Sequence, residues 1–160
     1  MQPDRQVDSV RELTPAFLRK LGKDTILFDI DNTLVAHDIP APTPEVLNFF
    51  KKFTEEGIKI ALLSNNSKER VDKFCSDLDI ICLFRAWKPL KKGFRQILRQ
   101  LGSTPESTVV AGDQLFTDIW GGNRLGCYTV LVTPIKPAET RFVAIKRRFE
   151  KFFLKNEKNY

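Results

Sequence analysis

The chain has 160 residues, of which 42% are hydrophobic and 29% are charged, and its formal net charge is +6. This length suits one domain, and the apolar fraction excludes a chain that is collagen-like or disordered throughout. Its uninterrupted apolar runs are no longer than a strand, far below the roughly 18–20 apolar residues of a membrane span.

Short apolar runs alternate with helical patterns from the start of the chain. Residues 25–30 form a β-rich run that predicts a buried strand. A helix is expected to begin after Thr43 as N-cap, with Pro44 in its first turn, and to end at Gly57. Residues 58–63 predict the next strand.

The same alternation continues to residue 132. Ser67 caps a predicted helix, and a helix with one apolar face ends at Gly102. The other predicted elements are strands around 80–84, 108–111 and 127–132 and a helix that ends near Gly126. Strands that alternate with helices favour parallel pairing with right-handed crossovers. We therefore predict a doubly wound α/β fold, with helices on both faces of a parallel sheet.

Polar residues follow four of the predicted strands, where ligands bind in sheets of this class. They are Asp29, Asp31 and Thr33; Ser64, Asn65 and Asn66; Lys88; and Asp113 with Asp118. Asp29 and Asp31 would project to the same side of an extended chain, where their repulsion calls for a cation or a shared proton. One carboxylate could attack an electrophile while the other moves a proton, and Mg²⁺ suits such oxygen ligands. By themselves the two acids could also be turn residues that cap a strand. The polar residues at the other three strand ends make this purely structural role the less favoured interpretation.

These residues resemble the four motifs of the haloacid dehalogenase (HAD) superfamily, in the same order. The motifs are Asp29-Ile30-Asp31-Asn32-Thr33, Leu63-Ser64-Asn65, Lys88 and the stretch from Gly112 to Asp118. With its continuation to Gly126, the fourth motif is similar to that of the YqeG-like group of subfamily IIIA. That group is related to mitochondrial phosphatidylglycerophosphate phosphatases.

The resemblance implies a role for each residue. Asp29 would be the nucleophile that forms an aspartyl-phosphate, while Asp31 would protonate the leaving alcohol and then deprotonate water. Ser64 would hydrogen-bond the phosphoryl oxygens, and Lys88 would neutralise charge on them and on the nucleophile. The Mg²⁺ ligands would be Asp29, Asp113, the backbone carbonyl of Asp31 and, directly or through water, Asp118. Thr33, Asn65, Asn66 and Arg124 are the candidate substrate-binding residues.

Phosphoryl transfer is favoured over the carbon–halogen hydrolysis found in the same superfamily. A dehalogenase has little need of a second acid or a metal, yet Asp31, Asp113 and Asp118 are all present. A regulatory protein without activity would be expected to lack one of them. The only histidine, His37, is interpreted as a solvated loop residue without a catalytic role.

The spacing between motifs leaves no room for a cap domain. Thr33 and Ser64 are 31 residues apart and Ser64 and Lys88 are 24 apart, distances that the core elements fill. We therefore expect a single domain over residues 1–160, with a core at about 22–135, and an open site. An open site suits a protein, a nucleic-acid end or a head group at a bilayer, although a small metabolite stays an alternative.

The basic excess of the chain is concentrated at its end. Residues 141–160 hold seven basic and two acidic residues, which leaves a net charge of +1 for the first 140. In the segment 138–160, Phe142, Ile145, Phe149 and Phe152 have helical spacing. This pattern indicates either a basic helix on an anionic bilayer or a helix packed on the sheet.

Our leading hypothesis is a Mg²⁺-dependent phosphatase acting on phosphatidylglycerophosphate at the cytosolic face of the membrane. The alternatives are a soluble phosphatase for a nucleotide, sugar or protein phosphate, and a non-catalytic interaction module. No nucleic-acid partner is expected, because no nucleic-acid-binding motif is present. A cytoplasmic protein is also expected from the absence of a secretory pattern in the first 20 residues and from Cys75, Cys82 and Cys127, interpreted as reduced.

Overall fold

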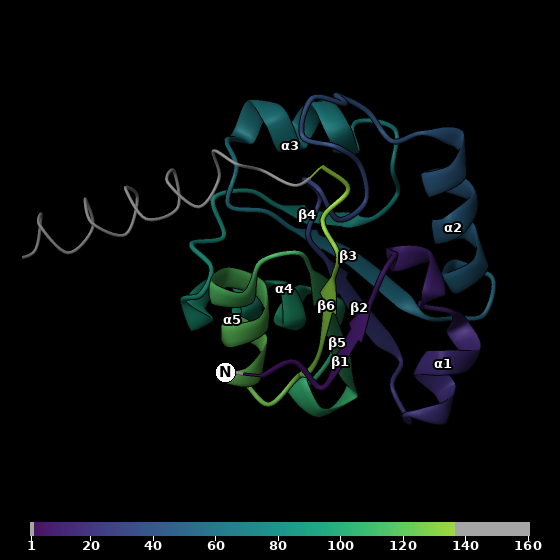
Figure 1. The fold of residues 1–160 in the computed structure, drawn as a ribbon, viewed down its shortest axis with the longest axis vertical. Coiled ribbons are helices and arrows are strands. Elements are labelled where there is room, and N and C mark those ends of the chain that lie inside the picture. Colours follow the sequence, from purple (N-terminus) through teal and green to yellow (C-terminus); the bar gives the residue numbers. More distant parts are fainter. Residues whose placement is uncertain (1, 137–160) are drawn as a thin grey trace, which may run out of the picture.

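The computed structural model describes residues 2–136, in which six parallel strands form one sheet (Figure 1). The strands lie in the order β1-β6-β5-β2-β3-β4. They are β1 (Arg5–Val7), β2 (Thr25–Phe28), β3 (Lys59–Leu63), β4 (Ile81–Leu83), β5 (Thr108–Gly112) and β6 (Tyr128–Val132). The chain order reverses beside β2, which confirms the predicted doubly wound fold.

Helices cover both faces of the sheet. On one face lie α1 (Pro15–Lys20), α2 (Pro44–Thr54) and α3 (Lys68–Cys75), and on the other lie α4 (Lys91–Leu101) and α5 (Trp120–Asn123). Short helical turns complete the set at Val10–Glu12, Pro105–Ser107 and Leu115–Ile119. Within residues 2–136, we find no helix with the length and apolar character needed to cross a membrane.

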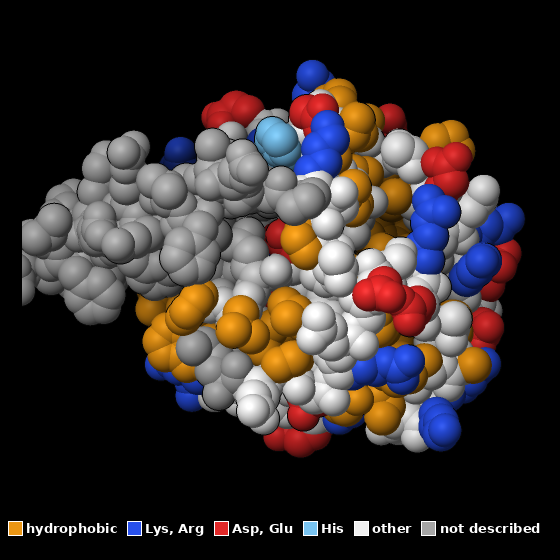
Figure 2. Space-filling view, viewed as in Figure 1, with side chains coloured by type: hydrophobic (Ala, Val, Ile, Leu, Met, Phe, Trp, Pro, Cys, Tyr) orange, Lys and Arg blue, Asp and Glu red, His pale blue; other side chains and the backbone are white. Residues whose placement is uncertain are grey.

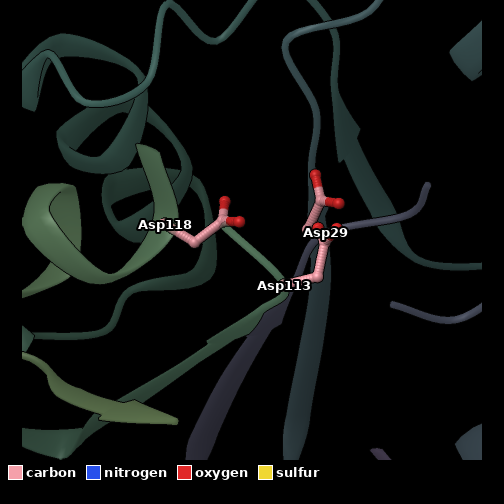
Figure 3. A group of neighbouring side chains, drawn as sticks. All are labelled: Asp29, Asp113 and Asp118. Carbon is pink, nitrogen blue, oxygen red and sulfur yellow. The ribbon is translucent and has the colours of Figure 1, made fainter. Parts of the chain in front are cut away.

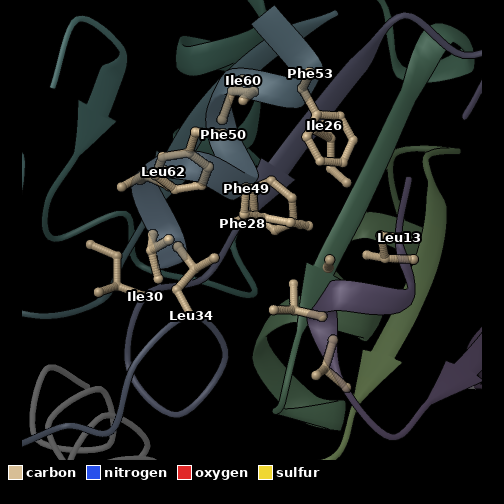
Figure 4. Close-up of a cluster of buried hydrophobic side chains, with 14 of the residues drawn as sticks. Leu13, Ile26, Phe28, Ile30, Leu34, Phe49, Phe50, Phe53, Ile60 and Leu62 are labelled. Atoms are coloured by element: carbon tan, nitrogen blue, oxygen red, sulfur yellow. The ribbon is translucent and has the colours of Figure 1, made fainter. Parts of the chain in front are cut away.

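The strands are apolar on both sides because each side packs against helices. Along β2, Ile26 and Phe28 join the cluster under α2, whereas Leu27 joins the cluster under α4. Phe28 packs its ring against Phe49 and Phe53 of α2, with centroids 5.6 and 6.1 Å away (Figure 4). These edge contacts fix the end of β2, from which Asp29 follows.

Local signals in the sequence place the ends of the helices. The side chain of Thr43 accepts a hydrogen bond from the amide of Val46, and that of Ser67 accepts one from the amide of Arg70. Gly102 ends α4 in the left-handed region, with φ of 60°. These three predicted boundaries are confirmed, because each depends only on residues close in the sequence.

Two features depend on distant residues and differ from expectation. The edge strand β1 was not predicted, since only one of its three residues is apolar, but it pairs with β6. The expectation of three reduced cysteines is wrong for two of them: Cys75 at the end of α3 forms a disulfide with Cys82 in β4, while Cys127 is free and buried. The two cysteines meet because α3 and β4 lie next to each other in the fold. The number and spacing of cysteines in the sequence do not reveal this packing.

No folded insert interrupts the described core. Residues 29–43, between β2 and α2, contain turns and one isolated bridge, and α3 is the only helix between β3 and β4. The carboxyl edge of the sheet therefore has no cap contributed by residues 2–136. The basic segment 138–160 lies outside the described residues.

Candidate active site

Three carboxylates meet at the carboxyl edge of the sheet (Figure 3). Asp29 follows β2, Asp113 follows the neighbouring β5, and Asp118 projects from the π-helical turn Leu115–Ile119. One oxygen atom of each residue lies within 4.8 Å of the others. The parallel pairing of β2 with β5 thus brings together acids that are 84 residues apart in the sequence.

Lys88 is buried among these acids. Its Nζ atom lies 2.6 Å from Oδ1 of Asp29 and 2.6 Å from Oδ1 of Asp118. Asn65 holds the backbone of Lys88 from both sides, because its Nδ2 donates to the Lys88 carbonyl and its Oδ1 accepts from the Lys88 amide, at 2.9 and 2.7 Å. Asn65, a candidate substrate-binding residue in the sequence, therefore also positions the lysine.

Asp118 can reach the cluster because Gly112 has no side chain. A Cβ atom at Gly112 would lie 2.3 Å from the Asp118 carboxyl carbon, well inside van der Waals contact. The second oxygen of Asp118 accepts a hydrogen bond of 3.1 Å from the amide of Gln114. The glycine of the fourth motif is thus required for the close approach of this carboxylate to the strand end.

The buried charges do not balance within the group. Three carboxylates face one ammonium, and burial, followed by the charges of Asp118 and Asp113, raises the pKa of Asp29 to about 8 even though Lys88 opposes the shift. For Lys88, burial acts to lower the pKa, but the charges of Asp118 and Asp29 outweigh it and hold the pKa above its ordinary value. A further positive charge would relieve this excess.

One buried oxygen indicates where that charge would bind. Oδ2 of Asp29 has no hydrogen-bond partner among the residues that the structure describes. Because buried polar atoms normally have partners, an orphaned carboxylate oxygen beside two other carboxylates fits a ligand that the protein itself does not supply. Hard oxygen donors of this kind fit a divalent cation.

The Asp31 side chain is not one of the three carboxylates that group within 4.8 Å of one another. The strand ends at Phe28, and the chain then turns, with the amide of Leu34 donating to the carbonyl of Ile30. The Asp31 carboxylate instead accepts hydrogen bonds from Arg70, at 2.9 Å, and from Asn66, at 3.2 Å. Its side chain is not part of the group of three, and a backbone role at the metal stays a prediction.

Arg70 is the site residue that sequence reasoning missed. It lies in the first turn of α3, pairs with Asp31, donates to the carbonyl of Pro40 at 3.1 Å and places its guanidinium 5.4 Å from the centroid of the Phe74 ring. Its side chain is 15% exposed. The one available signal was its place three residues after Ser67, which puts it at the start of a helix that begins beside the second motif.

The remaining predicted site residues divide into two groups. Ser64 is buried, with its hydroxyl accepting from the amide of Asn66 at 3.1 Å, and the hydroxyl of Thr33 lies 3.5 Å from Oδ1 of Asp113. Arg124, in contrast, is exposed at the end of α5 with its guanidinium over Trp120. The chain continues from there into the amino end of β6, so the structure does not bring Arg124 to the acids.

Comparisons with known proteins agree with this geometry. Residues 36–126 match the model of a family described as haloacid dehalogenase-like hydrolase. The chain is 38% identical to the probable phosphatase YqeG of Bacillus subtilis, over 95% of this chain and 88% of that protein. It is 28% identical to the chloroplastic/mitochondrial phosphatidylglycerophosphate phosphatase 1 of Arabidopsis thaliana, over 96% of this chain but 47% of that protein.

Solved structures show the same fold at low sequence identity. The cobalt-bound deoxy-D-mannose-octulosonate 8-phosphate phosphatase of Haemophilus influenzae superposes with a TM-score of 0.55 and 18% identity, over 70% of this chain and 69% of that one. At this identity the likeness concerns the arrangement of strands and helices.

Proposed function

Since the chain belongs to the haloacid dehalogenase-like hydrolases, we propose that it is a Mg²⁺-dependent phosphatase that hydrolyses a phosphomonoester through an aspartyl-phosphate. One observation carries the proposal. Asp29 is buried, with one oxygen held by Lys88 and the other free of hydrogen bonds among the described residues. A carboxylate arranged in this way is suited to attack an electrophile that enters the site.

In the first step, a carboxylate oxygen of Asp29 attacks phosphorus and the bond from phosphorus to the alcohol oxygen breaks. Asp31 gives a proton to that leaving oxygen, while Arg70 and Asn66 hold its carboxyl group in place. Lys88 offsets negative charge on Asp29 and on the transferred group. Mg²⁺, held by the side chains of Asp29, Asp113 and Asp118, would supply further charge stabilisation.

In the second step, a water molecule attacks phosphorus and the phosphorus–Asp29 bond breaks. Asp31 takes the proton of that water, so the residue returns to its initial state and inorganic phosphate leaves. Asp31, in the loop after β2, is held by Arg70 and Asn66, and a carboxyl group fixed in this way suits two successive proton transfers.

Binding of Mg²⁺ is expected to stabilise the protein measurably. At a Mg²⁺ concentration about a hundred times its Kd, binding contributes roughly 2.7 kcal/mol, which raises Tm by about 5–10 °C for a chain of this size. Differential scanning calorimetry of chelator-treated protein, titrated with MgCl₂ at pH 8, measures the shift. Asp113→Asn should show little of it, and an equal shift in that variant would contradict the assigned ligands.

We propose phosphatidylglycerophosphate as the substrate. The similarity to the Arabidopsis phosphatidylglycerophosphate phosphatase supports this choice, as does a carboxyl edge that no folded insert within residues 2–136 covers. A lipid head group held at a bilayer needs an open approach to the nucleophile. The reaction would release inorganic phosphate and leave phosphatidylglycerol.

A phosphate-release screen tests the substrate directly. We expect kcat/KM for phosphatidylglycerophosphate in mixed micelles to exceed that for glycerol 3-phosphate, a nucleotide and a phosphopeptide by about a hundredfold or more. Such a margin follows if remote parts of the lipid contribute binding energy. Faster turnover of a soluble phosphoester would reject the lipid and retain the chemistry, whereas no turnover of any of them would reject both.

A further inference from the structure

Four large apolar side chains are exposed next to the catalytic segments. Trp87, Leu90, Phe116 and Trp120 are exposed by 58%, 44%, 45% and 37%, and we call these four residues the apolar rim. Figure 2 shows hydrophobic side chains gathered over α5, the helix that begins at Trp120. Single exposed hydrophobic residues are common, but a group that includes both tryptophans of the chain needs a reason.

The two segments that carry the rim are joined to each other. Lys88, between Trp87 and Leu90 in sequence, binds the carboxylate of Asp118, which lies between Phe116 and Trp120. A Cβ atom on Gly121 would lie 3.3 Å from Cα of Pro89, so α5 packs directly on the loop that holds Lys88. The two segments therefore pack together. They hold Lys88 and Asp118 in the interior and expose the apolar rim on the surface.

The chain keeps this surface apolar at a cost in local stability. Trp87 has φ of 55°, in the left-handed region, which is unfavourable for a residue other than glycine. Leu90 is the N-cap of α4 and makes no side-chain cap hydrogen bond, whereas α1, α2 and α3 are capped by Thr14, Thr43 and Ser67. Both positions break a local preference in favour of an exposed apolar side chain, as happens at functional surfaces.

The exposed charged residues on the two segments that carry the rim have one sign. The sequence contains no acidic residue from 80 to 105 or from 119 to 136, and Asp118 itself is buried against Lys88. The exposed cations of the two segments are Arg85, Lys92, Arg95, Arg99 and Arg124. An apolar surface on segments whose exposed charges are all basic is complementary to a layer with an anionic surface and an apolar interior.

We propose that the apolar rim is the surface by which this protein binds an anionic phospholipid bilayer. The rim would enter the head-group region, where tryptophan rings are favoured, and the surrounding cations would face lipid phosphates. The inference rests on the proposed function, because a lipid substrate requires the site to meet a bilayer, and it concerns described residues rather than the basic segment 138–160. Leu90 favours a bilayer over a nucleic acid, since a leucine side chain offers no face for base stacking.

Tryptophan fluorescence of the full chain tests the contact at the rim itself. Vesicles of phosphatidylglycerol and phosphatidylcholine are expected to shift the emission to shorter wavelength, and brominated phospholipids in the same vesicles should quench it. Both effects report on the rim because Trp87 and Trp120 are the only tryptophans of the sequence. Binding without quenching would mean contact through another segment, such as residues 141–160, and would overturn the proposal.

Substitutions separate the rim from other surfaces. Trp87→Asn removes the ring and keeps a residue that tolerates positive φ, and Phe116→Gln removes a second ring from an exposed position. We expect the double variant to lower the vesicle partition coefficient by at least about tenfold in sedimentation with vesicles. Leu47→Gln is the matched control, because Leu47 is 43% exposed on α2, and it should bind as the parent chain does.

The outcomes distinguish the rim from the proposed function. Hydrolysis of soluble p-nitrophenyl phosphate by the double variant should match that of the parent chain, whatever its membrane binding. Unchanged vesicle binding in the double variant would overturn the proposal, as would sedimentation equilibrium showing a dimer that the two substitutions dissociate. If the rim binds vesicles and no phosphoester is hydrolysed, the proposal of membrane binding is supported and the phosphatase proposal fails.

Discussion

Asp29→Asn is expected to lower phosphate release by at least about a thousandfold, because the amide cannot act as the nucleophile. The same substitution is expected to stabilise the metal-free protein at pH 8. In the parent chain the pKa of Asp29 is raised to about 8 by burial and by the neighbouring acids, so the folded state holds a proton that the unfolded state has released.

The sign of the pH dependence follows from that difference. Below about pH 4 both states are protonated, and as the pH rises towards 8 the unfolded state binds fewer protons than the folded state, so the free energy of unfolding falls. Asp29→Asn should remove this fall. Urea unfolding in chelator at pH 5.5 and pH 8 measures it, and Asp77→Asn, an exposed aspartate on the surface, is the control that should keep it. A variant as pH-sensitive as the parent chain would contradict the assignment.

Lys88→Met is expected to be the most destabilising single change at the site. It leaves the buried carboxylates of Asp29 and Asp118 without their shared cation, and the loss of one partner from a buried ion pair costs about 3–5 kcal/mol. Activity should also fall sharply, because no other positive side chain within residues 2–136 bonds to Asp29. Chemical unfolding in chelator and phosphate release measure the two effects.

A second substitution tests the physical reason. Adding Asp118→Asn to Lys88→Met removes one of the uncompensated charges, so the double variant should regain part of the lost stability and the two effects should not add. Lys92→Met changes an exposed cation in the first turn of α4, four residues after Lys88, and should alter the free energy of unfolding by less than about 0.5 kcal/mol. A similar small loss for Lys88→Met would refute the charge argument.

The sequence predicts the acids and the lysine at the site because of how parallel sheets are built. Asp29, Asp113 and Lys88 each follow a strand or lie in the loop just after one, and all carboxyl ends of parallel strands lie on the same edge. Alternating apolar runs are therefore enough to gather them. The distances between these side chains, and the lack of a partner for one oxygen of Asp29, could be seen only in the folded structure.

Contacts that depend on the placement of a helix could not be predicted. The pairing of Arg70 with Asp31 requires α3 to lie beside the loop that follows β2, and the hydrogen bonds of Asn65 to Lys88 require two loops to meet. The disulfide of Cys75 with Cys82 has the same origin. No local propensity in the sequence carries this information, because the partners come from different elements.

The position of β1 in the sheet has a consequence for synthesis of the chain on the ribosome. Arg5 pairs with Val130, so the first strand to emerge has its partner near residue 130. Until β6 has been made, β1 has no neighbour to accept its hydrogen bonds, and closing a contact of this sequence separation is slow. The last edge of the sheet therefore forms after almost all of the described chain has been translated, and a nascent chain stalled before residue 128 would expose the edge of β5 to other strands.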